Sequence, residues 1–381
     1  MADSPVMEPF EVLSWEQLRA RTSIKWRMFE PDVLPLWVAE MDAPPVPSVV
    51  EAVTAAVRTG DLGYPPPDDT YAVALADVAA ARWGWRLEAA STSLVADVLT
   101  GVREALDVVT APGDAILLPA PVYHPLVDIP AAMGRRLVTC TLTTEGRLDL
   151  AAIEVGLADP MVRALLLCSP HNPTGVVHTR AELEAVAALA ADRGVAVVVD
   201  EIHALVVPGG GRFTPYLSVT DSGIVVTSAS KAYNMAGIKA ALIAVGAADV
   251  HLLERLPATL RWGASKIGLV AHVAAWSGGD AWLDAVNANI AANAAFLGEL
   301  LAERMPAVRY APPRATYLAW LDCRTLGLGD DPAEAFRERG RVALNSGTEF
   351  GPGGEGFVRV NIAASRATLT EAVERMASVR D

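Results

Sequence analysis

This sequence has few cysteines, no long apolar run and no excess of positive charge. Its three cysteines, Cys140, Cys168 and Cys323, show no CxxC spacing and cannot all pair within one chain. We therefore expect small buried side chains in a reducing compartment, with no disulfide framework. The longest apolar stretches fall well short of the roughly 20 residues that a membrane helix needs, so no membrane partner is expected.

The charge balance excludes a second class of partners. The formal net charge is -14, and nucleic acids and anionic membranes are themselves polyanions, so the chain is not expected to bind nucleic acid. The segment Met1–Glu11 has no basic stretch followed by an apolar run, so no secretory signal is expected and we place the chain in the cytoplasm. The histidines show no ligand spacing, which predicts no metal site. A small molecule is the expected partner.

Apolar runs and helical patterns alternate over residues 94–245. Continuous apolar strands joined by helices indicate an α/β fold with a mainly parallel, seven-stranded sheet between helices. The expected strands are residues 94–99, 115–118, 136–142, 163–168, 195–199, 224–228 and 240–245.

Beyond residue 247 long helices and short strands indicate a smaller α+β domain. We expect an N-terminal arm over residues 1–46 that contributes to this small domain. A large ligand-binding domain would cover 47–278, and the C-terminal small domain 279–381.

Lys231 follows the buried strand 224–228 directly. A lysine held in an apolar pocket near other cations loses its proton easily and becomes a nucleophile toward an aldehyde. Ser228, Ser230 and Lys239 could hold a phosphate beside it. Pyridoxal phosphate is the cofactor that needs both groups, although an ordinary solvated surface lysine is the alternative.

Two further strands are followed by groups that suit the same cofactor. After strand 94–99, the expected helix opens at Gly101, and its free amide hydrogens suit a phosphate; an ordinary turn is the alternative. Val102 and Arg103 belong to this turn. Tyr123 follows strand 115–118 and could stack on a flat ring, or serve as a core tyrosine.

The next two strands end in an amide and a carboxylate. Asn172 lies in the turn after strand 163–168, could donate to a phenolic oxygen, and is expected to precede a cis bond to Pro173. Asp200 ends strand 195–199, where a buried carboxylate needs a cationic partner such as a protonated pyridine nitrogen. His203 follows three residues later.

In the small domain, Arg359 lies within the apolar strand 357–362. Its planar fork matches a carboxylate, so we expect it to bind the α-carboxylate of an amino-acid substrate. A structural ion pair is the alternative.

Together these residues resemble the fold-type I pyridoxal-phosphate enzymes, the aspartate aminotransferase superfamily, over essentially the whole chain. The closer similarity is to the MalY/PatB branch of cystathionine β-lyases, or C–S lyases. The motifs that carry it are Lys25-Trp26, Trp37 to Asp42, Cys168 to Gly175, Asp200 to His203, Ser230 to Asn234, and Arg359 to Ala363.

The resemblance implies a role for each of these positions. Lys231 would form the Schiff base, Asp200 would meet the pyridine nitrogen and Asn172 the ring oxygen. Tyr123 would stack on the ring. The remaining cofactor positions would be Gly101, Val102, Arg103, His203, Ser228, Ser230 and Lys239.

The resemblance also implies a homodimer with shared active sites, in which Tyr64 reaches the phosphate of the neighbouring subunit. Tyr64 is otherwise a turn-packing aromatic between Gly63 and Pro65. Substrate contacts would come from Arg359, Trp37, Val38, Ala39 and Asn345.

Several positions depart from the branch pattern near the expected side-chain pocket, so they leave the substrate open: Glu40, Ala43, Val177-His178 and Asn345. The implied reaction is C–S β-elimination, with α-proton abstraction by Lys231, from L-cystathionine or a related cysteine S-conjugate. An aminotransferase acting on an amino acid and a 2-oxo acid is the alternative. A regulatory protein that binds a transcription factor is a third.

Overall fold

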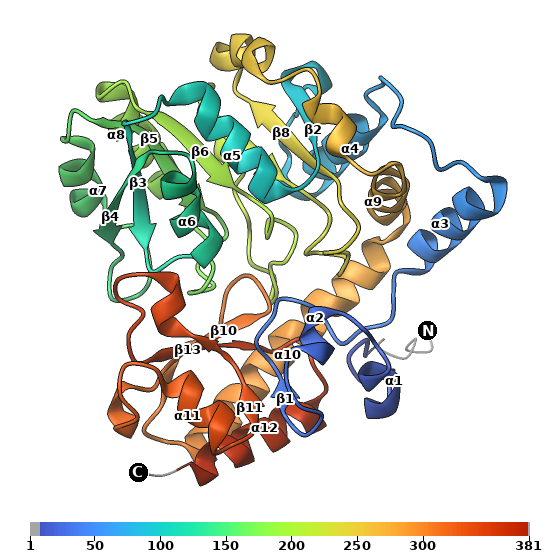
Figure 1. Ribbon diagram of the computed structural model, residues 1–381, viewed down its shortest axis with the longest axis vertical. Helices are drawn as coiled ribbons and strands as arrows, with labels where there is room; N and C mark the ends of the chain where they lie inside the picture. The colour runs from blue at the N-terminus through green and yellow to red at the C-terminus, as the bar shows by residue number, and fades with distance from the viewer. Residues whose placement is uncertain (1–7, 380–381) are drawn as a thin grey trace.

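The computed structural model describes residues 8–379, so the first part of the segment Met1–Glu11 lies outside the described residues. A seven-stranded sheet forms the larger part of the molecule, with strand order β2-β8-β7-β6-β5-β3-β4 (Figure 1). The strands are β2 Thr92–Val95, β3 Ala115–Ala120, β4 Arg136–Thr141, β5 Val162–Cys168, β6 Ala196–Asp200, β7 Ile224–Thr227 and β8 Ala241–Val245.

The sheet is mostly parallel, as the sequence predicts. Strands β4, β3, β5, β6 and β7 run parallel, while β8 is antiparallel to both of its neighbours, β7 and β2. Alternate residues along each strand point to opposite faces. Ile116 and Leu118 belong to the core with α5 (Val98–Val109) and α6 (His124–Ala132), and Ala115 and Leu117 to the core with α7 (Leu150–Leu157) and α8 (Arg180–Asp192). Both faces are therefore covered.

The boundary between β2 and α5 differs from the sequence-based prediction. The strand ends at Val95, and the helix begins at Val98 instead of Gly101. The cause is Asp97, whose side chain accepts a hydrogen bond from the backbone N–H of Thr100 at 2.9 Å and caps the helix. Gly101 consequently lies inside the helix, where an added Cβ would approach the Val226 side chain to 2.5 Å.

The small sheet has the order β12-β13-β10-β9 and is antiparallel. Its strands are β9 Arg309–Tyr310, β10 Leu318–Asp322, β12 Asn345–Ser346 and β13 Phe357–Asn361. The neighbouring helices are α11 Pro332–Glu338 and α12 Arg366–Ser378. Helix α10, Asp280–Arg304, runs from the large-sheet part to the small-sheet part (Figure 1).

The N-terminal arm lies against this smaller part. It contains α1 Trp15–Arg19, α2 Ile24–Arg27 and β1 Leu34–Pro35, and β1 pairs in parallel with β11, Val342–Ala343. The arm and the C-terminal elements thus lie side by side (Figure 1). The domain boundaries at residues 46 and 278 stay a prediction.

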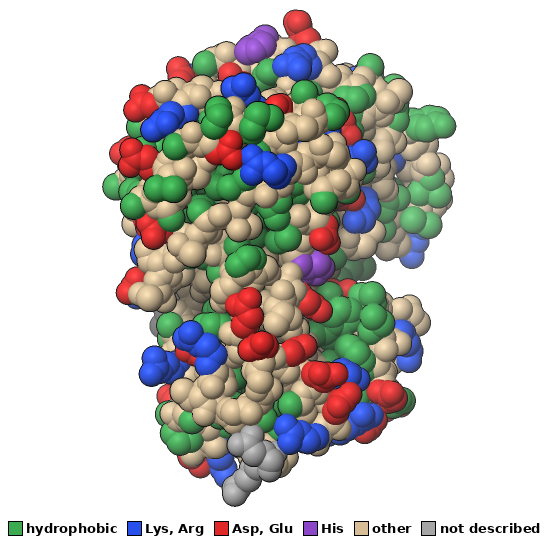
Figure 2. All heavy atoms as spheres, turned by 60° about the vertical axis from the view of Figure 1, so that its left-hand side comes forward, with side chains coloured by type: hydrophobic (Ala, Val, Ile, Leu, Met, Phe, Trp, Pro, Cys, Tyr) green, Lys and Arg blue, Asp and Glu red, His purple; other side chains and the backbone are tan. Residues whose placement is uncertain are grey.

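Three further helices pack together, with α3 Pro47–Thr59 and α4 Thr70–Trp83 each in contact with α9 Lys266–Gly278. Short 3-10 helices complete the chain: Ala89–Ser91, Tyr216–Ser218, Ala247–Arg255, Leu260–Gly263, Arg324–Leu326 and Gly347–Phe350. Over residues 8–379, none of the helices has the length and apolar character to cross a membrane. Figure 2 shows a face on which basic side chains are scattered among acidic ones, and an outline that narrows between the two parts of the molecule.

Candidate active site

A cavity of about 170 Å³ lies at the carboxyl ends of β5, β6 and β7. Ligands of open α/β sheets bind at this edge because loops and helix N-termini converge there. Many of the site residues predicted from the sequence line this cavity: Ala39, Tyr123, Asn172, Asp200, His203, Ser228, Ser230, Lys231 and Lys239.

Lys231 presents its amine inside the cavity. Its Nζ donates a hydrogen bond to the backbone carbonyl of Ala39 at 3.2 Å. Burial, together with the positive charge of Arg359, lowers the pKa of Lys231 to about 8. A substantial fraction of this amine is therefore neutral near physiological pH, as a nucleophile toward an aldehyde requires.

Asp200 closes β6 and lines the same cavity. The side chain is buried, and its Oδ1 accepts a hydrogen bond from the backbone N–H of Ile202 at 3.0 Å. Burial raises the pKa of Asp200 to about 6. The buried Nδ1 of His203 has no hydrogen-bond partner among residues 8–379. A buried carboxylate and an unpartnered ring nitrogen in one cavity suit a polar heteroaromatic ring with a protonated nitrogen.

A second group of lining residues suits a phosphate. Ser228 Oγ donates to the carbonyl of Ala240 at 2.7 Å and accepts from the backbone N–H of Ser230 at 3.2 Å. Lys239 brings an ammonium group, and the first turn of α5 brings its positive dipole end. The residues present therefore fit pyridoxal phosphate.

Sequence reasoning missed three lining residues at this end: Asp97, Val98 and Leu99. The available signal was Asp97, a favoured helix-capping residue placed directly before an apolar helical run. In the structure, Asp97 Oδ2 also pairs with Lys239 Nζ at 3.2 Å.

The glycine turn lies outside this lining. Gly101, Val102 and Arg103 are one turn further along α5, and the first two are buried against the sheet. Their contact with the phosphate stays a prediction, which the lining by Val98 and Leu99 does not support.

Tyr123 and Asn172 meet at the cavity wall. The backbone N–H of Tyr123 donates to the backbone carbonyl of Asn172 at 3.0 Å. The bond from Asn172 to Pro173 is cis, which confirms the sequence-based hypothesis, and cis bonds also precede Pro121 and Pro170. Burial raises the pKa of Tyr123, so its hydroxyl stays protonated.

Arg359 lies near the cavity on β13, although it does not line it. Its Nη1 donates to Asn172 Oδ1 and its Nη2 to the carbonyl of Trp37, each at 3.0 Å, and Nη2 also bonds to Asn345 Oδ1. No carboxylate among residues 8–379 forms an ion pair with this guanidinium. Burial lowers the pKa of Arg359 to about 10, so it stays a cation. An unneutralised buried cation suits an anionic ligand.

The other residues expected to contact the substrate or the partner's phosphate do not all line the cavity. Trp37 and Val38 accept hydrogen bonds through their carbonyls, while only their neighbour Ala39 lines the cavity. Tyr64 lies outside the cavity with 83% of its surface exposed, edge-on to Trp262.

Comparison with known proteins places this geometry in a family. The family model "Aminotransferase class I and II" matches residues 31–376. The cystathionine β-lyase of Corynebacterium glutamicum is 36% identical, with 96% of this chain and 98% of the relative covered. Cystathionine β-lyase PatB of Bacillus subtilis is 33% identical, with 95% and 97% covered.

The structure of cystalysin from Treponema denticola, which contains pyridoxal 5'-phosphate, superimposes with a TM-score of 0.89 at 26% identity and covers 96% of this chain and 97% of its own. These similarities confirm the expected fold class and the expected cofactor. The chain therefore belongs to the aminotransferase class I and II family and, within it, to the PatB- and MalY-like branch that its motifs indicate.

Proposed function

We propose that this chain is a pyridoxal-phosphate-dependent C–S β-lyase that cleaves L-cystathionine or a related cysteine S-conjugate. The observation that carries the proposal is the placement of Lys231 and Asp200 in one cavity, beside the unneutralised cation of Arg359. The full-length similarity to proteins named cystathionine β-lyase supports the choice of reaction.

Different residues bind the substrate and transfer the proton. Arg359 binds the α-carboxylate of the substrate and so orients the Cα–H bond. Lys231 removes the Cα proton as a general base. Asp200 keeps the pyridine nitrogen protonated, and the bound cofactor supplies the electron sink for the charge at Cα.

The net reaction consumes one water molecule. The Cβ–S bond breaks, the sulfur leaves with a proton as a thiol, and the remaining three-carbon fragment is released and hydrolysed to pyruvate and ammonia. No 2-oxo acid acceptor is required, which separates the lyase from an aminotransferase.

The decisive experiment supplies the purified holoenzyme with L-cystathionine and no 2-oxo acid. Sustained release of pyruvate and thiol in equal amounts is expected. Amino-group transfer to an added 2-oxo acid, without pyruvate release, would instead establish the aminotransferase. Lys231→Ala serves as the inactive control.

The proposed assembly is a homodimer with shared active sites. Exposed apolar side chains support it: Val50, Val57, Leu62, Tyr64 and Trp262 are between 46% and 83% exposed. Such side chains on and beside one helix, α3, suit contact with a second copy. Tyr64 would then reach the partner's phosphate.

A subunit-mixing experiment tests this assembly. Lys231→Ala and Tyr64→Ala subunits are each expected to be nearly inactive, whereas a refolded mixture regains activity because each hybrid dimer holds one intact site. Light scattering should give twice the mass of one chain. A monomer, or a mixture no more active than its parts, would refute shared sites.

We also place the protein in the cytoplasm. Two of its cysteines, Cys168 and Cys323, are buried free thiols, and burial raises their pKa, which suits a reducing compartment. Cell fractionation with an antibody to the chain tests this location.

A further inference from the structure

Residues 37–42, which we call the strap, run beside the cavity without forming a helix or a strand. An irregular backbone must bond its carbonyl groups elsewhere when water is excluded. In the strap, side chains from distant parts of the chain do this. The bonds run from Arg359 to Trp37 (3.0 Å), from Asn361 to Val38 (2.9 Å) and Glu40 (2.6 Å), from Tyr317 (3.0 Å) and Lys231 (3.2 Å) to Ala39, and from Asn234 to Met41 (2.9 Å).

Two of these donors are the central residues of the proposed site. Lys231 bonds to the carbonyl of Ala39, and Arg359 bonds to the carbonyl of Trp37. The position of the strap therefore sets where both the amine and the guanidinium lie. A small displacement of the strap would move the group that receives the substrate carboxylate.

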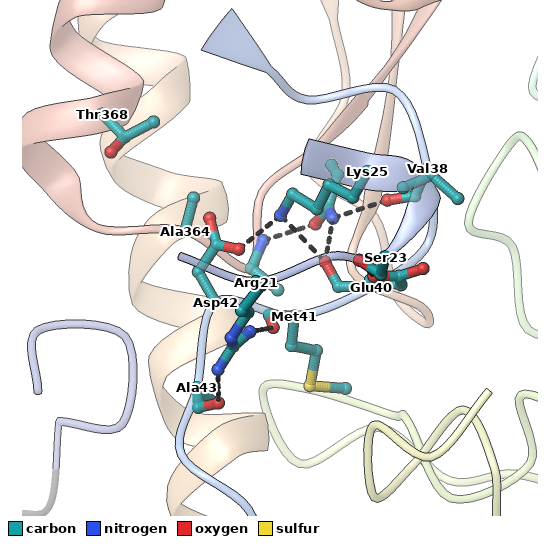
Figure 3. Close-up of polar contacts among 12 residues, drawn as sticks. Arg21, Ser23, Lys25, Val38, Glu40, Met41, Asp42, Ala43, Ala364 and Thr368 are labelled. Carbon is teal, nitrogen blue, oxygen red and sulfur yellow. Dashed lines mark hydrogen bonds and ion pairs between the residues drawn. The ribbon is translucent and has the colours of Figure 1, made fainter. Parts of the chain in front are cut away.

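Lys25, on helix α2 of the same N-terminal arm, also holds the strap (Figure 3). Lys25 Nζ lies 2.5 Å from Asp42 Oδ1, and both side chains are at most 2% exposed. The same Nζ donates to the backbone carbonyl of Glu40 at 3.0 Å. Arg21 adds hydrogen bonds to the carbonyls of Met41 at 3.2 Å and Ala43 at 2.7 Å.

A buried ion pair is an inefficient source of stability, because desolvation of the two charges offsets their attraction and an apolar pair of similar volume often does as well. What an apolar pair cannot do is bond to the backbone. Lys25 reaches a strap carbonyl as well as a strap carboxylate, so it holds the backbone of Glu40 and the side chain of Asp42 in one place.

We propose that Lys25 is a positioning residue for the active site: with Asp42 it fixes the strap, and through the strap it orients Arg359 and Lys231 for the amino-acid substrate. This inference rests on the proposed function only in that an amino acid binds at Arg359. It does not depend on whether the bound amino acid loses a thiol or an amino group.

The test uses the holoenzyme and L-alanine, which has no leaving group, so binding is measured apart from lyase activity. The absorbance change of the bound cofactor on titration gives the dissociation constant. Lys25→Met and Asp42→Asn are each expected to weaken alanine binding about tenfold. If Lys25→Met does not fold, Asp42→Asn alone decides, because it keeps the side-chain volume.

Two matched variants separate positioning from stability. Arg135, like Lys25, is a buried cation paired with a carboxylate, Asp107, at 2.7 Å, but it lies at the opposite edge of the large sheet from the cavity. Arg135→Met is expected to lower the melting temperature without changing alanine affinity.

The double variant Lys25→Met with Asp42→Leu replaces the ion pair by an apolar pair. Its melting temperature is expected to rise above that of Lys25→Met, while its alanine affinity stays weak because the Lys25 bond to the Glu40 carbonyl is still missing and, of residues 8–379, only Asn361 holds that group. The inference would be overturned if Lys25→Met and Asp42→Asn both bind alanine with wild-type affinity, or if the double variant does. A wild-type enzyme that binds alanine but releases no pyruvate would refute the proposed lyase and leave this inference standing.

Discussion

Arg359 Nη1 donates a hydrogen bond to the side-chain oxygen of Asn172 at 3.0 Å, joining residues that are 187 positions apart. The bond settles how the Asn172 amide is oriented, because Oδ1 must face the guanidinium. The amide nitrogen is then left as the donor for an acceptor in the cavity, such as the ring oxygen of the cofactor. One contact therefore links Arg359 on β13, the proposed carboxylate-binding residue, to Asn172 beyond β5, the proposed ring-binding residue.

Replacing Arg359 by lysine keeps the positive charge and removes the planar guanidinium group with its paired N–H donors. The ammonium has three N–H groups, too few to bond to Asn172 and Trp37 and also to a substrate carboxylate in a bidentate manner. We expect KM for the amino acid to rise about 100-fold, because a bidentate contact worth roughly 2–3 kcal/mol is lost. Steady-state kinetics check this, and the same substitution at the partly exposed Arg341 serves as the control. An unchanged KM would count against carboxylate binding by Arg359.

The pKa of Lys231 predicts how the apoprotein takes up pyridoxal phosphate. The neutral amine attacks the aldehyde, so with a pKa of about 8 the rate of uptake should rise about 50-fold from pH 6 to pH 8 and then level off. The positive charge of Arg359 contributes to this low pKa, and Arg359→Met should therefore move the profile to higher pH. Stopped-flow absorbance measures the uptake. Arg135→Met should leave the profile in place, and a flat profile in the wild type would contradict the prediction.

Burial of Asp200 should destabilise the apoprotein above pH 6. Its folded pKa of about 6 exceeds the ordinary value of 3.8, so stability is lost as pH rises through this window and stays lost above it. The size is about 3 kcal/mol, at 1.36 kcal/mol for each pKa unit. Asp200→Asn carries no charge at any pH, so its apoprotein should resist urea better than the wild type at pH 8 and lose that advantage near pH 4.

Asp159 provides a control, because its pKa is shifted in the opposite direction from that of Asp200. Its hydrogen bond to Arg136 lowers the pKa of this partly exposed carboxyl, so Asp159→Asn should give no gain at pH 8. A stability difference for Asp200→Asn that does not vary with pH would show that packing, and not the charge, causes it.

Asp97 should weaken the binding of the cofactor phosphate. Its carboxylate pairs with Lys239 at the helix end where the phosphate is expected, so two anions compete for one cation. Asp97→Asn keeps a capping side chain and removes the charge, and should tighten pyridoxal phosphate binding about fivefold, with a smaller effect at high salt. Equilibrium dialysis of the apoprotein measures the affinity.

Two further variants test whether the charge of Asp97 causes this effect. Asp97→Ser also caps the helix and should behave like Asp97→Asn, whereas Lys239→Met should weaken binding. Weaker binding in both neutral variants at Asp97 would mean that the carboxylate supports the site instead of opposing the phosphate.

The residue types and their order along the chain determined the main features in advance. Apolar runs of strand length, separated by helical patterns, predicted the mainly parallel sheet. Because parallel strands present their carboxyl ends at one edge, Tyr123, Asn172, Asp200 and Lys231 could be expected to meet there, and they do line one cavity. Local pattern and strand direction were sufficient for these residues.

Only the tertiary structure decided which groups share a bond. The capping bond of Asp97 moved the helix start to Val98 and placed this carboxylate beside Lys239, because caps depend on side-chain geometry that periodicity does not encode. Lys25 pairs with Asp42 and bonds to the Glu40 carbonyl only because the fold of the N-terminal arm brings together groups that are 15 to 17 positions apart. Sequence alone determined which chemical groups the protein has at its strand ends, whereas long-range packing decided their hydrogen-bond partners and pKa values, because burial and distance exist only in the folded chain.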